Sequence, residues 1–152
     1  VAPGEEDDFE ITSNDSIIRQ FRALTLAVRS GAGIISLIAL VAAGIGIMNI
    51  MLVSVTERTR EIGIRRAVGA KKRHVMTQFI TEAVLISAFG GIVGILVGIV
   101  GSQFEIAGVE PVVAGYSVLL AFAAAALSGL FFGTYPATRA ARLSPIDALR
   151  FE

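Results

Sequence analysis

Three long stretches of this sequence contain no Asp, Glu, Lys or Arg. They cover residues 31–55, 83–104 and 111–138 and are 25, 22 and 28 residues long. As an α-helix, the first would extend about 37 Å, enough to cross the roughly 30 Å hydrocarbon core of a bilayer. We therefore predict an all-α integral membrane protein with three transmembrane helices, at about residues 31–55, 76–101 and 114–136.

The overall composition supports a membrane protein. Of the 152 residues, 54% are hydrophobic and 17% are charged, whereas about 25% are charged in typical soluble domains. The chain contains no cysteine, which excludes disulfides and thiolate chemistry. Because it begins without a Met or a signal peptide, we expect Val1 to lie inside a longer protein.

The basic residues indicate the orientation in the membrane. Seven Lys and Arg lie between the first two uncharged runs and three follow the third, whereas the loop between the second and third runs has only Glu105 and Glu110 as charged residues. Cytoplasmic loops carry the excess of basic residues. We therefore predict that residues 56–75 and the C-terminus are cytoplasmic, and that residues 1–30 and 102–116 lie outside.

The segment before the first span predicts a stalk. We assign residues 1–14, which are acidic and turn-like, to the end of an extracytoplasmic domain. Residues 15–30 carry an apolar stripe at helical spacing, and Asn14 and Asp15 are candidate helix caps. The stripe consists of Ile17, Ile18, Phe21, Leu24 and Val28.

No proline separates this stripe from the first span, so we expect one helix over about residues 15–55. Its outer part would be an amphipathic stalk. The alternative is a helix that lies on the membrane surface and bends at Gly31 and Gly33.

Residues 57–70, ERTREIGIRRAVGA, place a charged, helix-prone stretch between the first two spans. Glu61 and Arg65 form an i, i+4 pair in the favourable order, and Gly69 is well placed to end the helix. We predict a short amphipathic helix over about residues 57–69 at the cytoplasmic surface. Its uncharged side is formed by Ile64, Ala67 and Val68.

This helix has two alternative roles. It either anchors the chain among lipid headgroups or docks on another protein. The second role is favoured because Glu57 and Glu61 are poor membrane anchors, and because Gly63 and Gly69 would permit close contact with a partner.

Small residues recur every four positions in the second and third predicted spans. Such ridges let helix backbones approach closely in lipid. We expect them to serve packing within one bundle rather than a pore or a gate. One ridge consists of Gly90, Gly94 and Gly98, and the other of Ala125, Gly129 and Gly133.

The end of the chain carries its own signals. Pro136 should end or kink the third span. Ser144, Pro145 and Asp147 have the spacing of a capped helix start, which predicts a terminal helix over about residues 145–152. Its side chains available for docking are Ala148, Leu149 and Phe151.

We find no catalytic motif. GIRRAVGAKK has the wrong spacing for a phosphate-binding loop, and His74 has no partner for a metal site. Glu82 should snorkel or pair with Arg73 rather than relay protons, and the span centres carry only Asn49 with scattered Ser and Thr, which disfavours a secondary transporter or channel. We expect no catalytic residue, no metal or cofactor in this chain, and no nucleic-acid partner.

Two segments resemble the permease module of MacB-type, or FtsX-like, ABC transporters. Residues 48–87, MNIMLVSVTERTREIGIRRAVGAKKRHVMTQFITEAVLIS, are similar to its central part, and residues 136–152, PATRAARLSPIDALRFE, to its C-terminal ending. The resemblance covers about residues 31–152, and residues 7–30 resemble the family's stalk.

The resemblance implies four spans per subunit, with a large external domain between the first and the second. This chain would then hold the last three spans. It also implies that the family's coupling helix, which docks on the cytoplasmic ATPase, corresponds to about residues 57–70. The residues assigned to ATPase coupling are Glu57, Arg58, Glu61, Ile62, Gly63, Arg65, Arg66, Gly69 and Ala70.

The resemblance further implies a bacterial cytoplasmic membrane and several partners. These are an ATP-binding subunit or domain that holds ATP and Mg²⁺, a second permease subunit and, in the macrolide-export branch, a periplasmic adaptor and an outer-membrane channel. The implied function is mechanotransmission, in which ATP hydrolysis drives an external conformational change and export. The alternative is a regulatory complex, like the cell-division member of the family, that controls an external enzyme without transport.

Overall fold

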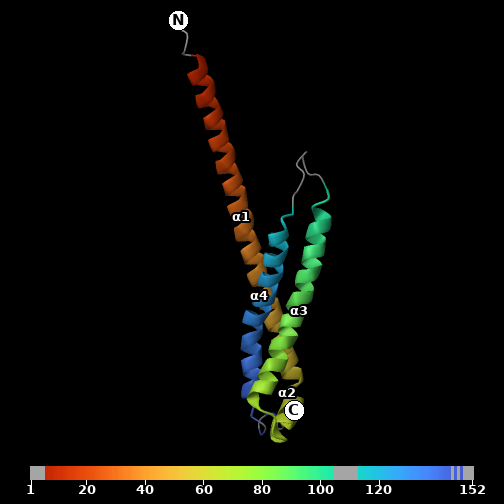
Figure 1. Ribbon diagram of the computed structural model, residues 1–152. Helices are drawn as coiled ribbons and strands as arrows, with labels where there is room; N and C mark the ends of the chain where they lie inside the picture. Colours follow the sequence, from red (N-terminus) through yellow and green to blue (C-terminus); the bar gives the residue numbers. More distant parts are fainter. Residues whose placement is uncertain (1–5, 105–112, 145, 147, 149–152) are drawn as a thin grey trace. The chain divides into compact units, whose positions relative to one another are not determined.

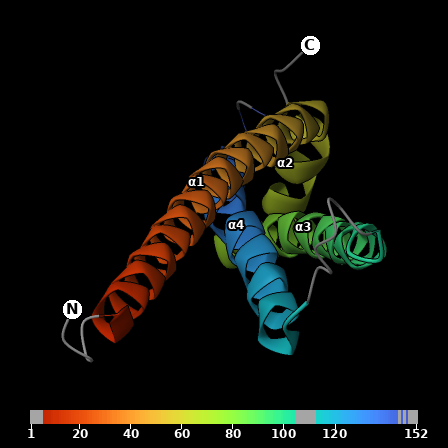
Figure 2. The ribbon, with the colours of Figure 1, turned by 90° about the horizontal axis from the view of Figure 1, so that it is seen from above.

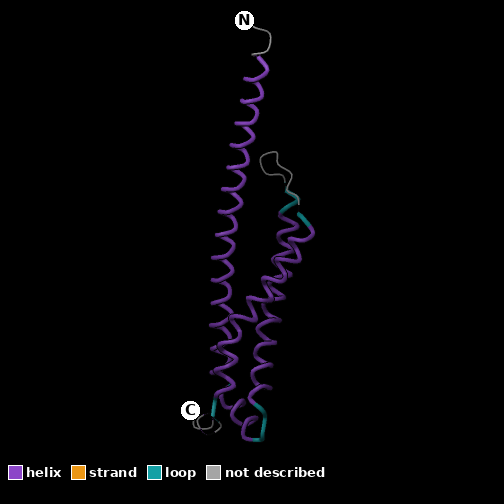
Figure 3. Tube along the Cα trace, turned by 60° about the vertical axis from the view of Figure 1, so that its left-hand side comes forward, coloured by secondary structure: helices purple, strands orange, loops and turns teal. Residues whose placement is uncertain are grey.

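The computed structural model describes residues 6–104, 113–144, 146 and 148, with side chains from residue 14 onward (Figure 1). Within these ranges all regular structure is helical and no strand occurs (Figure 3). The helices are α1 (Glu6–Glu57), α2 (Thr59–Ala67), α3 (Lys72–Gly101) and α4 (Gly115–Arg142). Helices α1, α3 and α4 are long and apolar enough to cross a membrane, which confirms the predicted fold class.

Helix α1 covers the whole of the helix predicted over residues 15–55 and begins earlier, at Glu6. The prediction that Asn14 and Asp15 cap its start is wrong, because both lie inside the helix. Residues 6–30 contain neither glycine nor proline. Each of them therefore costs little free energy in a helix, and the helix can extend through this segment. The helix also continues through Gly31 and Gly33 without a break.

The chain divides into two compact units, Val1–Ala39 and Leu40–Glu152. Among the described residues, the first unit is the part of α1 up to Ala39, and its apolar stripe is exposed, including Phe21 and Val28. The hydroxyls of Thr25 and Ser36 donate to backbone carbonyls four residues earlier, at 2.8 Å. The hydroxyl groups of Thr25 and Ser36 therefore have hydrogen-bond partners within α1.

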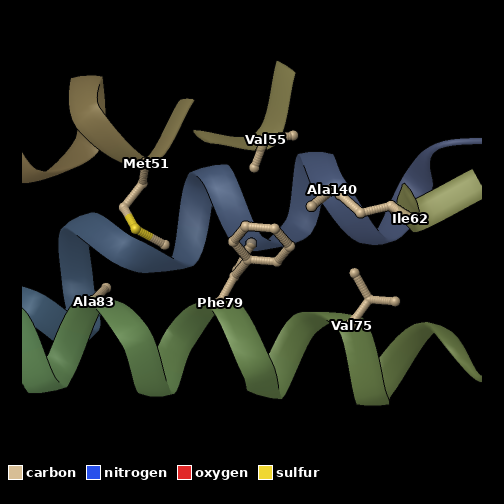
Figure 4. Close-up of a cluster of buried hydrophobic side chains, with 8 residues drawn as sticks. Met51, Val55, Ile62, Val75, Phe79, Ala83 and Ala140 are labelled. Carbon is tan, nitrogen blue, oxygen red and sulfur yellow. The ribbon is translucent and has the colours of Figure 1, made fainter. Parts of the chain in front are cut away.

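The second unit is built on the contact between α3 and α4, which run side by side (Figures 1 and 2). Its hydrophobic core gathers side chains from the last turns of α1 and from α2, α3 and α4 around Phe79 (Figure 4). Only 2% of Phe79 is exposed. The core consists of Met51, Val55, Ile62, Val75, Phe79, Ala83, Ala137 and Ala140.

Small residues permit the close approach of α3 and α4. A Cβ atom added to Gly129 would clash with the side chain of Ser87 and would lie 2.8 Å from the backbone oxygen of Ala83. One added to Gly133 would clash with the Cβ of Ala83. The predicted ridge on the third span therefore lies in this contact.

The matching ridge on α3 is not the one singled out in the sequence. It consists of Ala83, Ser87 and Gly91, and a Cβ added to Gly91 would lie 2.7 Å from the Cβ of Ala125. At Gly90, Gly94 and Gly98, an added Cβ would meet no described atom within 4 Å apart from its chain neighbours and the nearby backbone of its own helix. Of these three glycines, Gly94 and Gly98 line a groove of about 410 Å³ between α3 and α4, together with residues such as Val118 and Ala121.

Helix α4 does not end at Pro136, which lies inside it, but continues to Arg142. Of the two outcomes predicted for this proline, ending the span is therefore wrong. Pro136 is fully buried, and Ala137, Ala140 and Ala141 extend the same buried face. A proline cannot donate a helical hydrogen bond, and the packing of this buried face compensates for that loss, so the helix continues.

The contrast between the two ridges is testable with matched substitutions. Gly129→Val should lower the thermal stability of the purified protein in detergent, because overpacking costs about 1–3 kcal/mol and each kcal/mol corresponds to about 2–4 °C at this chain length. Gly94→Val should leave the melting temperature within about one degree of the parent, since it meets open space. Equal melting of the two variants would contradict the assigned contact.

Candidate functional site around helix α2

Helix α2 connects the end of α1 to the start of α3 (Figure 2). A single residue, Arg58, separates it from α1, and the Thr59 hydroxyl donates to the backbone oxygen of Val55 at 2.9 Å. The helix is followed by Gly69, whose φ of +104° is in the left-handed region that favours glycine. The prediction that Gly69 ends the helix is confirmed.

The inward face of α2 is buried against the rest of its unit. Thr59, Ile62 and Gly63 are its buried residues. Ile62 belongs to the same core cluster as Val75 of α3 and Ala140 of α4 (Figure 4). Its side chain is 4% exposed, so the helix is held by the core on this side.

Gly63 and Arg66 contact the C-terminal part of the chain. A Cβ added to Gly63 would lie 2.5 Å from the Cβ of Ala148, and Arg66 Nη1 donates to the backbone oxygen of Ala141 at 3.3 Å. Ala148 of the same chain therefore lies against Gly63, at a position where the sequence suggested close contact with a partner protein.

The terminal helix predicted over residues 145–152 lies largely outside the described residues, as do Leu149 and Phe151. Residues 146 and 148 are helical, and the amide of Ala148 donates to the backbone oxygen of Ser144 at 3.0 Å. Ala148 is 1% exposed, so this residue docks on the bundle.

The outward face of α2 carries exposed apolar side chains between charged ones. Ile64 and Val68 are 49% and 86% exposed, and Ala67 is exposed as well. Ile64, Val68 and Arg65 line one side of a shallow pocket of about 450 Å³, and the start of α3, including His74 and Gln78, lines the other. This exposed surface, formed by Glu61, Ile64, Arg65, Ala67 and Val68, is called the α2 outer face below.

The predicted pair between Glu61 and Arg65 is confirmed, since their side chains form an ion pair on the α2 outer face. Arg65 Nη1 also donates to Gln78 Oε1 at 3.0 Å, which ties the side chain to α3. Exposed ion pairs contribute at most about 1 kcal/mol to stability. The Glu61–Arg65 pair matters here because it holds a negative and a positive group in fixed positions on the same exposed surface.

Glu82 pairs with Arg58. The sequence predicted that it would snorkel or pair with Arg73, so the predicted partner is wrong. Arg58 Nη1 lies 3.6 Å from Glu82 Oε2, and both side chains are partly exposed. Arg58 occupies the turn between α1 and α2, from which its side chain reaches α3. This ion pair joins the turn to α3, a long-range contact that the sequence does not reveal.

The structure separates the residues assigned to ATPase coupling into several groups. Ile62, Gly63 and Arg66 face inward, Arg58 is paired with Glu82, and Glu57 is exposed at the end of α1. Glu61 and Arg65 are exposed on α2, and Gly69 and Ala70 lie in the following turn. Their role in coupling stays a prediction.

Ile64 and Val68 are absent from that assignment although they dominate the α2 outer face. The signal that identifies them is their i, i+4 spacing, which puts both side chains on one side of the helix. Within the described residues, no group of three or more His, Cys, Asp and Glu side chains is placed to hold a metal ion.

Known proteins are similar to this chain over most of its length. The model of the FtsX-like permease C-terminal family matches residues 33–145. The macrolide export ATP-binding/permease protein MacB of Bdellovibrio bacteriovorus is 51% identical over 120 residues, which cover 78% of this chain and 18% of that protein. The pyoverdine export ATP-binding/permease protein PvdT of Pseudomonas entomophila is 43% identical over 146 residues, or 95% of this chain and 22% of that protein.

A shorter relative is the uncharacterized ABC transporter permease YknZ of Bacillus subtilis. It is 42% identical over 151 residues, which cover 98% of this chain and 38% of that protein. The chain therefore spans between about a fifth and two fifths of the length of these relatives.

The two faces of α2 predict effects of different size on stability for the same substitution, Ile→Ala. Ile62→Ala should cost about 2–5 kcal/mol of unfolding free energy, because it leaves a cavity in the core. Ile64→Ala should change it by no more than about 0.5 kcal/mol, because that side chain is half exposed. Thermal denaturation of both variants in detergent tests the assignment, and a larger loss for Ile64→Ala would reverse the two faces.

Proposed function

The chain belongs to the FtsX-like permease C-terminal family, and we propose that it is the membrane module of a MacB-type ABC transporter. In this proposal it couples ATP hydrolysis in the cytoplasm to a conformational change outside the membrane and to export. The observation that carries the proposal is the division of α2 into a buried inward face and an exposed outer face. A helix of this kind can receive a push from a partner and pass it to the helices behind it.

The orientation in the membrane follows from the distribution of basic residues. Seven Lys and Arg lie within residues 56–75, which hold α2 and its neighbouring turns, and none occurs in the sequence between α3 and α4. By the positive-inside rule, this distribution supports a cytoplasmic α2 and C-terminus and an external N-terminal end of α1. The span helices expose most of their apolar side chains, such as Ile50 and Leu119, which suits contact with lipid or with a second permease subunit.

The α2 outer face suits a protein partner in the cytoplasm. Ile64 and Val68 offer apolar area that becomes buried on docking. Full burial of an exposed side chain of this size contributes about 1.5–3 kcal/mol, and Ile64, which is already half buried, would contribute about half as much. The Glu61–Arg65 pair beside them adds donors and acceptors that set the register of the partner. We assign this surface to an ATP-binding subunit or fused domain, which would bind ATP and Mg²⁺.

Helix α1 is the proposed route to the outside. It ends at Glu57, one residue before α2, and its helical backbone continues without a break to Glu6. A helix that crosses the membrane boundary keeps its backbone groups hydrogen-bonded within itself, which opposes bending there. Movement of α2 would therefore be passed along α1 to an external domain and, in an export system, to an adaptor and an outer-membrane channel.

Reversal of the charged pair tests the docking surface. The double variant Glu61→Arg/Arg65→Glu keeps oppositely charged side chains at the same spacing but in the less favourable order, so insertion should match the parent and stability should fall by no more than about 0.5 kcal/mol. A partner that recognises the charge pattern would meet inverted charges, and export should fall at least about tenfold, a change that corresponds to 1.4 kcal/mol. Export and ATP hydrolysis are measured in the full transporter, and parental export would rule out this surface.

A flexible insertion tests α1 as a mechanical element. Gly-Gly-Ser-Gly inserted after Ser30 should abolish export and spare ATP hydrolysis, because the added glycines interrupt the helix. The control is a seven-residue, alanine-rich helical insertion at the same position, which lengthens the helix by about two turns and nearly preserves its facing. It should retain more export than the flexible insertion. A fully active Gly-Gly-Ser-Gly variant would contradict transmission through α1.

A further inference from the structure

The inward face of α2 meets a segment of the chain that the proposed coupling does not use. Ala148, beyond the end of α4, is 1% exposed and lies against Gly63. Carbon atoms pack best at about 3.5–4.0 Å, whereas a Cβ on residue 63 would lie 2.5 Å from the Ala148 Cβ. The C-terminal segment therefore occupies the space that a side chain at position 63 would need.

A second contact lies one turn further along the same face. Arg66 Nη1 donates to the backbone oxygen of Ala141 at 3.3 Å, and α4 ends at Arg142. The last carbonyls of a helix lack partners within the helix and carry partial negative charge. The Arg66 guanidinium is thus a cation placed at the C-terminal end of α4.

Gly63 and Arg66 are three residues apart, so their contacts lie on one side of α2. Together they fasten α2 to the end of α4 and to the segment that follows it. The core contact of Ile62 with α3 and α4 also holds α2 against these helices. A displacement of α2 must therefore either carry the C-terminal end of α4 with it or break these contacts.

We infer that the segment after α4 is a positioning element for α2, with Gly63 and Arg66 as the positioning residues and Ala148 as the part of the segment that meets Gly63. This inference rests on the proposed function in so far as α2 is the docking helix. It adds a second route, through α4, by which movement of α2 reaches the membrane helices.

The geometry is tested by a disulfide in the full transporter. The chain has no cysteine of its own. The double variant Gly63→Cys/Ala148→Cys therefore introduces the only two cysteines of this sequence. Cβ atoms joined by a disulfide are about 3.8 Å apart, a spacing reached by a small outward shift of the segment. Mild oxidation in membranes should cross-link this pair within the chain.

The control for the cross-link is Ile64→Cys/Ala148→Cys. Ile64 lies on the α2 outer face, so this pair should remain reduced under the same conditions. Equal cross-linking of both pairs, or none of the first pair, would overturn the position of the segment. This result does not depend on whether α2 docks on an ATPase.

The positioning role is tested by exchanging the two side chains. Gly63→Ala should lower the amount of substrate exported per ATP hydrolysed by about fivefold to tenfold, because the added methyl group displaces α2 from the segment. Ala148→Gly alone removes the contact without creating a clash, so it should lower export per ATP by less than Gly63→Ala does. The double variant, which moves the methyl group from one partner to the other, should recover export per ATP to within about twofold.

Two results would overturn the role: an unaffected Gly63→Ala variant, or a double variant no better than Gly63→Ala. Recovery in the double variant would be expected only if the two residues act through their mutual contact. If export is unaffected by charge reversal at Glu61 and Arg65 while Gly63→Ala is impaired and rescued, the docking surface is misassigned but the positioning role stands.

Discussion

The close approach of α3 and α4 is the contact on which the rest of the second unit depends. In lipid, apolar side chains gain little by meeting one another, so helices associate where small residues let their backbones come near. Ala83 and Ser87 on α3 meet Gly129 and Gly133 on α4 in this way. The contact sets the separation of the two helices at the end where Phe79 and Ala140 form the core that receives Ile62.

The burial of Ile62 divides α2 between two tasks. One face is committed to the chain itself, through the core, through Ala148 and through the end of α4. The other face leaves Ile64 and Val68 exposed beside a charged pair. In the proposed function, the outer face receives force from a partner, and the contacts of the inward face would hold α2 in place against it.

Much of this architecture can be predicted from the sequence because it depends on local patterns. The uncharged runs predict the spans, the i, i+4 spacing predicts the Glu61–Arg65 pair, and Gly69 predicts the end of α2. Contacts between distant residues could not be predicted. Four-residue ridges occur on more than one side of α3, and only the packing with α4 selects Ala83, Ser87 and Gly91. The partners of Glu82 and Gly63 likewise depend on how the helices fold together.

The central claim is that the α2 outer face binds the ATP-binding partner. A photo-crosslinking amino acid at Val68, which is 86% exposed, tests it most directly in the intact transporter. Docking of this face should give a cross-link from Val68 to the ATP-binding subunit or domain. The same group at Val53, an exposed residue near the end of α1, should label lipid or another span instead. Labelling of lipid alone from Val68 would contradict the account and favour a membrane anchor.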